Sequence, residues 1–181
     1  MRPMFTIHAG EYLVGLHLQQ RLGLNVWIPA KDTGIDLLVT DRANRRTVSL
    51  QAKYGKDFLP GKSAVLRDSL RCLSWFALNR NKLKDSPAEF WVFVLHSFKS
   101  NEPDFVVIPK IELHQRLTEL HSNGTLHIYL CSTESDSCWE TRGLRDDMLE
   151  LEEGVRKNPL RDFTQYLNAK GWAALSEKLT A

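Results

Sequence analysis

The segment EFWVFVLHSF, residues 89–98, constrains the fold of this chain more than any other stretch. Its apolar run is unbroken, so a strand formed by it has no face that suits water and needs cover on both sides. The chain has 181 residues, 43% of them hydrophobic, which is enough for one well-packed domain and a modest appendage. The run therefore predicts an α/β protein in which this strand lies inside a central sheet.

Apolar spacing and turn residues predict the elements around this strand. A second helix is expected over residues 69–83, where Leu70, Leu73, Phe76 or Ala77, and Leu83 recur at helical spacing. The order α-β-β-β-α-β-β-α-β predicts a mixed sheet flanked by helices. The other expected elements are helices at 11–22 and 110–121 and strands at 24–29, 34–40, 47–54, 104–109 and 125–132.

The C-terminal part of the sequence looks helical after a polar segment, 133–143, that is expected to be a loop. Leu144, Met148, Leu151 and Val155 mark an amphipathic helix that ends before Asn158. Asn158 can cap a further helix with proline at its first position; this helix would continue to about residue 179, with a break at Gly171. The sequence thus predicts a body at residues 1–133 and a helical C-terminal extension at 134–181.

Several classes of protein are excluded or disfavoured by composition. No run of eighteen apolar residues exists, which excludes a membrane-spanning helix. The N-terminal residues lack a basic and then apolar signal segment, and the three cysteines show no paired spacing, so we expect a reducing, cytoplasmic location. His121, His127, Cys131 and Cys138 match no standard zinc spacing, and no phosphate-binding glycine loop is found.

Charge is segregated along the chain although the net charge is only +2. Residues 31–84 contain 12 Lys or Arg against 5 Asp or Glu, whereas residues 85–154 contain 5 against 14. A folded chain of this kind can present a basic face that attracts phosphates, although solvated surface charge alone also explains the pattern.

Gln51 and Lys53 stand out within the strand expected at 47–54, because a lysine beside a neutral amide is unusual as packing. In an extended segment the two side chains share one face. Glu11 lies at the start of the first helix, and Asp36 follows Gly34 on the preceding strand. We expect these four side chains to converge on one concave, solvent-reachable site.

This layout resembles the PD-(D/E)xK nuclease superfamily, whose first helix supplies Glu and whose hairpin supplies Asp and (Glu/Asp/Gln)-x-Lys. The resemblance covers roughly residues 10–132 and involves the motifs GE, GID and LQAK. It implies a restriction-endonuclease-like αβββαβ core and a metal-dependent DNA endonuclease, restriction-, repair- or defence-like. The catalytic residues would be Glu11, Asp36, Gln51 and Lys53.

The residue types also suit phosphodiester hydrolysis, which needs an activated water and neutralised charge, both of which Mg²⁺ provides. Asp36 is the best candidate for a direct ligand, and the Gln51 carbonyl and the Ala52 backbone carbonyl would add oxygens. Glu11 would bind the metal or hold one of its waters. Lys53 would orient the attacking water and oppose negative charge, and Mn²⁺ is an expected substitute for Mg²⁺.

Double-stranded DNA is the expected substrate, because the resemblance points to it and the basic segment surrounds the motif. A chain of this size that cuts both strands is expected to act as a homodimer. The candidates for phosphate contacts are Lys31, Lys56, Lys62, Arg67 and Arg71.

The sequence leaves other interpretations open. Glu11 can simply favour a helix N-terminus, Asp36 can cap a turn, and Lys53 can extend from an edge strand. Because Gln51 replaces an acid, the chain can also be a catalytically inactive nuclease-fold protein that binds nucleic acid or a protein. A third interpretation is an interaction subunit of a larger defence or mobile-element complex that docks through residues 134–157.

Two tryptophans and one histidine are expected to have structural rather than functional roles. Trp75 and Trp91 fall in core-like stretches and are expected to pack in the interior. His8 precedes Glu11 by three residues and is interpreted as a surface histidine.

Overall fold

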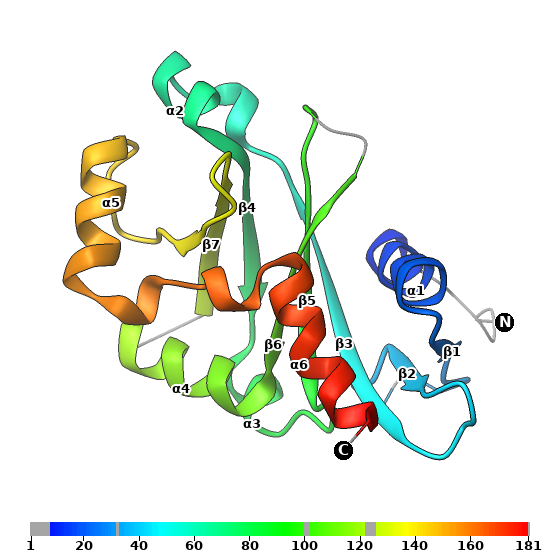
Figure 1. The fold of residues 1–181 in the computed structure, drawn as a ribbon. Helices are drawn as coiled ribbons and strands as arrows, with labels where there is room; N and C mark the ends of the chain where they lie inside the picture. The colour runs from blue at the N-terminus through cyan, green and yellow to red at the C-terminus, as the bar shows by residue number, and fades with distance from the viewer. Residues whose placement is uncertain (1–7, 32, 100–101, 122–125, 181) are drawn as a thin grey trace, which may run out of the picture.

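The fold is described from a computed structural model that covers residues 8–31, 33–99, 102–121 and 126–180 (Figure 1). The N-terminal residues 1–7 and Thr125, the first residue of an expected strand, lie outside the described residues. The main elements are α1 (Ala9–Leu22), β1 (Asn25–Trp27), β2 (Leu37–Thr40), β3 (Thr47–Lys56), α2 (Ala64–Ser69), β4 (Leu70–Leu78), α3 (Arg80–Lys84), β5 (Phe90–His96), β6 (Asp104–Pro109), α4 (Lys110–Leu120), β7 (Leu126–Thr133), β8 (Cys138–Glu140), α5 (Met148–Lys157) and α6 (Asn168–Thr180).

The predicted mixed sheet is present, with strands in the order β1-β2-β3-β5-β6. β3 and β5 are parallel, and the other neighbouring strands are antiparallel. β5 comes from the apolar run; its residues Phe90 to Leu95 are all buried between β3 and β6. The α/β class and the mixed sheet are therefore confirmed.

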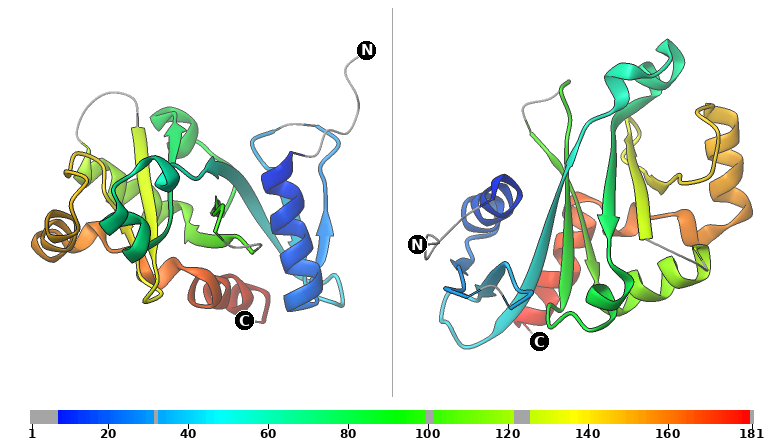
Figure 2. Two further views of the ribbon diagram at one scale, coloured as in Figure 1. Left: turned by 90° about the horizontal axis from the view of Figure 1, so that it is seen from above. Right: turned by 180° about the vertical axis from the view of Figure 1, so that it is seen from behind.

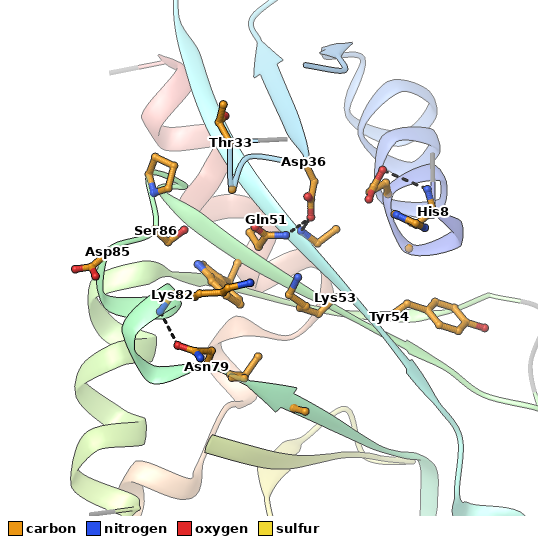
Figure 3. A pocket seen from close by; sticks show the side chains of 18 of the residues that line it. His8, Thr33, Asp36, Gln51, Lys53, Tyr54, Asn79, Lys82, Asp85 and Ser86 are labelled. Atoms are coloured by element: carbon orange, nitrogen blue, oxygen red, sulfur yellow. Dashed lines mark hydrogen bonds between the residues drawn. The ribbon is translucent and has the colours of Figure 1, made fainter. Parts of the chain in front are cut away.

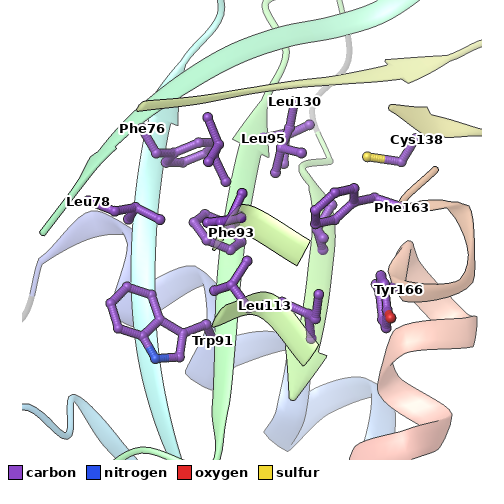
Figure 4. Packing of buried hydrophobic residues seen from close by; sticks show 14 of the residues in the cluster. Phe76, Leu78, Trp91, Phe93, Leu95, Leu113, Leu130, Cys138, Phe163 and Tyr166 are labelled. Atoms are coloured by element: carbon purple, nitrogen blue, oxygen red, sulfur yellow. The ribbon is translucent and has the colours of Figure 1, made fainter. Parts of the chain in front are cut away.

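The two faces of β5 belong to different cores, which explains its unbroken apolar sequence. Val92 and Val94 pack with residues of α1 and α6. Phe93 and Leu95 pack with residues of β4, β7 and α4 (Figure 4). In both Figure 1 and Figure 2, α1 lies on the opposite side of β3 from β7 and α5. One face of the main sheet is thus covered by helices and the other largely by a second sheet.

The prediction of a helix over residues 69–83 is wrong, because its central part is strand β4. Leu70, Cys72, Phe76 and Leu78 occur at even positions and are buried, while Trp75 is partly exposed, which is the period of a strand. β4 pairs with β7 in a three-stranded sheet of order β4-β7-β8. The strand β8 also lies inside the segment 133–143 that was expected to be a loop.

The C-terminal elements pack on both of these cores and on a third cluster, in which Leu151 of α5 contacts residues of α2 and β4. α5 matches the predicted amphipathic helix, and Asn158 accepts a hydrogen bond from the Leu160 amide, but it caps only a three-residue 3₁₀ turn. Gly171 does not break α6: it is buried inside the helix, and a Cβ there would lie 2.1 Å from the Tyr166 carbonyl oxygen. Phe163 belongs to the core between the sheets.

The predicted boundary between residues 1–133 and 134–181 stays a prediction about folding units, but residues on both sides of it share the same cores. Trp172 and Leu175 of α6 pack against the face of the main sheet that α1 also covers. Among the described residues, no helix is long and apolar enough to cross a membrane.

Candidate functional site

Asp36 is held beside β3 by main-chain and side-chain bonds. Gly34 turns the chain with φ of 84°, and the Asp36 amide then donates to the Leu50 carbonyl at 2.8 Å. The Asp36 carboxylate accepts a hydrogen bond from the Ala52 amide at 2.8 Å and another from Gln51 Nε2 (Figure 3). Because the backbone fixes one of its donors, the carboxylate is oriented before any ligand arrives.

Gln51 and Lys53 share one face of β3, as the sequence predicts, and lie next to Trp91 and Phe93 of the parallel strand β5. Gln51 is buried and Lys53 is half-buried. The Lys53 ammonium lies 5.5 Å from the centroid of the Trp91 ring, a distance at which the ring face attracts a cation. This contact explains how the sheet tolerates a lysine beside its core.

Glu11 reaches the site from the first turn of α1. The helix approaches β3 closely, since a Cβ on Gly10 would lie 3.0 Å from Tyr54 Cβ. The His8 amide donates to Glu11 Oε2 at 3.2 Å. Burial raises the pKa of Glu11; the hydrogen bond from His8 opposes this shift, and the nearby Asp36 carboxylate reinforces it. Two carboxylates that repel one another in this way favour a cation between them.

A cavity of about 920 Å³ brings the four predicted side chains together (Figure 3). Glu11, Asp36, Gln51 and Lys53 all line it. Trp91 also lines it, and although its side chain is buried as predicted, its Nε1–H has no acceptor among the described residues. A buried donor without an acceptor suits a site that receives water or an anionic oxygen.

The far wall of the cavity comes from residues that the sequence did not indicate as functional. Four polar residues of the lining lie in or beside α3: Asn79, Asn81, Lys82 and Asp85. The first three fall within the helix expected at 69–83, which is why they were not recognised. Lys82 is exposed and supplies a second ammonium to the lining. The polar run that follows the period-two pattern of β4 was the available signal. His8, interpreted as a surface histidine, is exposed but also lines the cavity.

The five predicted phosphate contacts are not in the described lining of the cavity. Lys62 pairs with Asp146. Arg71 pairs with Asp104 at 2.8 Å and with Asp136 at 2.8 Å. Arg67 is exposed and donates to the Lys62 carbonyl at 2.9 Å. Lys31 and Lys56 are exposed.

The oxygen groups of the cavity fit Mg²⁺ better than a softer metal. The donor set is two carboxylates, Glu11 and Asp36, with the amide of Gln51 and the Ala52 carbonyl. Mg²⁺ is commonly bound through one or two carboxylates and keeps several waters. The described residues contain no cluster of three or more His, Cys, Asp or Glu side chains arranged to hold a metal, so substrate or water oxygens would have to complete the shell.

Comparisons with protein-family models, curated proteins and solved structures returned no match. The resemblance to the PD-(D/E)xK nucleases therefore stays a prediction. A function for this chain has to be argued from the residues of the cavity and their geometry, since function belongs to the site rather than the fold.

Proposed function

We propose that this protein is a metal-dependent nuclease that hydrolyses phosphodiester bonds in DNA, of the PD-(D/E)xK kind. The observation that carries the proposal is the lining of one cavity by Glu11, Asp36, Gln51 and Lys53. These four residues come from α1, the segment before β2, and β3, so the chain folds three elements together to assemble them.

Each residue has a role in this proposal. Asp36 and Glu11, with the Gln51 carbonyl and the Ala52 backbone carbonyl, would hold Mg²⁺ or Mn²⁺. The bound ion would lower the pKa of a coordinated water and neutralise charge on the phosphoryl group. Lys53 holds the attacking water in place and opposes the negative charge that develops on the phosphoryl oxygens.

Lys82 extends the same electrostatic logic to the opposite wall. Its ammonium lies in the lining together with that of Lys53, so the cavity offers two cations to a phosphate. A cation acts more strongly where it is less exposed to water, so the half-buried Lys53 should contribute more than the exposed Lys82. A phosphodiester entering the cavity would therefore lie between cationic groups on both sides.

Topology adds support of a coarser kind. A first helix, an antiparallel pair formed by β2 and β3, and a parallel neighbour β5 follow in the order that the resemblance implies. The connection from β3 to β5 differs, because it contains the strand β4 between the short helices α2 and α3. Because of this difference, the restriction-endonuclease-like fold is proposed together with the function.

One observation favours a second candidate, a nuclease-fold protein that binds nucleic acid without cutting it. Gln51 brings no negative charge to the site, and its Nε2 donates to Asp36. A site with fewer anionic ligands binds cations less tightly. A binding role for residues 134–157 toward a protein partner stays a separate proposal, for which Leu149, 76% exposed on α5, is the natural contact.

The deciding experiment measures cleavage of plasmid, hairpin and branched DNA in Mg²⁺, in Mn²⁺ and in EDTA. We expect metal-dependent cleavage that falls by about 100-fold or more in Asp36→Ala, since charge stabilisation at the reacting centre is commonly worth that much. Asp68→Ala, which removes an exposed carboxylate of α2, is the matched control and should cleave normally.

The same variants separate the two candidates. Titration calorimetry with Mn²⁺ should show binding to the wild type and to Asp68→Ala and much weaker binding to Asp36→Ala. Cleavage that survives in Asp36→Ala would refute the proposed site. DNA binding without cleavage in any metal would favour the non-cutting candidate.

A further inference from the structure

Partly exposed aromatic rings gather on the outer side of the second sheet. Trp75 of β4 and Tyr129 of β7 are paired across the sheet and are 39% and 38% exposed. Phe58 is 41% exposed, and its ring centroid lies 6.3 Å from that of Trp75; the ring centroids of His127 and Trp75 are 5.5 Å apart. We call Phe58, Trp75, His127 and Tyr129 the aromatic track. The prediction that Trp75 packs in the interior is wrong, because its side chain is 39% exposed.

The aromatic track is continuous with the candidate active site. It lines a hollow of about 730 Å³ that also includes Lys62 and Arg142. A shallower hollow of about 290 Å³ shares Phe58 and Trp75 with the first one and also contains Lys56. Lys53 and Tyr54 line both this shallow hollow and the cavity that holds Glu11 and Asp36. A chain of hollows therefore leads from the cavity, past Lys56, to the rings.

Asp57 fixes the junction at which β3 passes into the track. Its buried carboxylate accepts hydrogen bonds from the amides of Leu59 at 2.9 Å, Leu73 at 3.2 Å and Phe98 at 3.2 Å. Asp57 also forms a β-bridge with Ser74, next to Trp75. These hydrogen bonds fix the backbone that carries Phe58 and Trp75, so binding a ligand costs little additional conformational entropy there.

The charges beside the rings have the sign that a polyanion requires. Four cationic residues line the two hollows of the track: Lys53, Lys56, Lys62 and Arg142. Among the described lining residues the only carboxylate is that of Asp146, which pairs with Lys62. Stacking surfaces interleaved with cations match unpaired nucleotides, whose bases present flat faces and whose backbone carries one charge per residue. A docked protein would explain the rings but not the continuity with the cavity.

We propose that the aromatic track binds an unpaired stretch of single-stranded nucleic acid and leads it into the cavity. This inference rests on the proposed function and narrows it, because the substrate becomes DNA with a single-stranded region in place of fully paired duplex. Bases stack on Trp75, Tyr129 and Phe58, and Lys56 contacts the phosphates between the track and the cavity.

The test measures binding in EDTA, so that it does not depend on cleavage. The probes are a fluorescent oligonucleotide of about 20 deoxythymidines and a blunt duplex of the same length, followed by anisotropy. We expect tighter binding of the single strand, weakened about fivefold to 150-fold by Trp75→Ala or Tyr129→Ala, the usual range for loss of one stacked base. Trp27→Ala, which removes a 52% exposed tryptophan of β1, is the matched control and should bind normally.

A second variant guards against loss of folding in the ring mutants. Lys56→Gln changes an exposed side chain, and it should lower the slope of log affinity against log salt by about 1 while leaving thermal unfolding unchanged. Equal affinity for both probes together with unaltered binding by Trp75→Ala would overturn the inference. If Trp75→Ala changes the sedimentation of the DNA-free protein but leaves DNA binding unchanged, the inference is also overturned, and the track is a contact between copies of the chain.

Failure of this inference is distinguishable from failure of the proposed function. Single-strand binding that depends on the track, without any cleavage in Mg²⁺ or Mn²⁺, supports the track and refutes the nuclease. Cleavage that depends on Asp36, with no preference for the single strand and no effect of Trp75→Ala, supports the nuclease and refutes the track.

Discussion

Replacing Phe163 by alanine should destabilise the whole protein, although this residue lies in the C-terminal segment. Its side chain is fully buried in the core between the two sheets. The guanidinium of Arg116 lies 5.4 Å from its ring centroid, the Tyr166 ring lies 5.8 Å away, and its amide donates to the Cys138 carbonyl at 2.8 Å. A truncation here removes packing from α4, from β8 and from the C-terminal segment together.

The size of the effect follows from this burial. A buried Phe→Ala substitution costs about 3–5 kcal/mol, a large part of the roughly 5–15 kcal/mol that stabilises a typical protein. For a chain of this length each kcal/mol lowers the melting temperature by about 2–4 °C, so the expected loss is about 6–20 °C. Phe98→Ala is the matched control, because Phe98 is 75% exposed, and it should change stability by no more than about 0.5 kcal/mol.

The assay is urea unfolding followed by circular dichroism and by tryptophan fluorescence. Both probes should report one transition, and Phe163→Ala should move its midpoint for both. If Phe163→Ala costs no more than Phe98→Ala, the placement of Phe163 in the shared core is incorrect. If only a separate minor transition moves, residues 134–181 form an independent unit, as the sequence predicts.

Three further predictions concern titration and metal binding. Gln51→Glu removes a donor to Asp36 and adds a carboxylate beside it, so the metal-free variant should be less stable by about 1–3 kcal/mol. Adding Mg²⁺ should stabilise this variant more than it stabilises the wild type, and identical metal-induced shifts in melting temperature would contradict a ligand role for residue 51. The pKa of Glu11 is raised in the folded protein, so the contribution of Glu11 to stability falls as the pH rises from about 4.5 through that pKa. The melting temperature of Glu11→Gln relative to the wild type should therefore rise over this range, and a constant difference would contradict the raised pKa. Burial raises the pKa of Cys72 and of Cys131 to about 12 and raises the pKa of Cys138 well above its usual value. A thiol reagent at pH 8 should therefore label none of the three cysteines until urea unfolds the chain. Rapid labelling of the native protein would place a cysteine at the surface.

The sequence predicted those parts of the fold whose pattern allows one period only. The run that forms β5 is apolar at every position, so it had to be a strand or helix buried on all sides, and its length favoured the strand. Residues 70–78 were ambiguous, because Leu70, Leu73 and Ala77 fit a helical period while even positions fit a strand. Pairing with β7, whose partner residues lie 48 to 63 positions further along the chain, decided between the two, and such long-range pairing leaves no local trace.

The candidate site shows the same division. Gln51 and Lys53 were placed on one face by the two-residue period of β3, which needs no tertiary information. Lys82 was missed because its position follows from the end of β4. Lys62 and Arg71 looked available for phosphates, but their ion pairs join residues 33 or more positions apart and depend on the folded arrangement.

The position of β4 within the connection from β3 to β5 has a consequence for the kinetics of folding. The parallel pair joins Leu50 to Phe90, so closing the intervening loop costs about 3 kcal/mol of chain entropy before any contact repays it. β4 cannot lower this cost locally, since its own partner β7 begins only at Leu126. Each sheet is therefore interrupted along the chain by strands of the other: β4 lies between β3 and β5, and β5 and β6 lie between β4 and β7. Refolding should be slow, on a timescale of about milliseconds to seconds, with the two sheets forming in the same step.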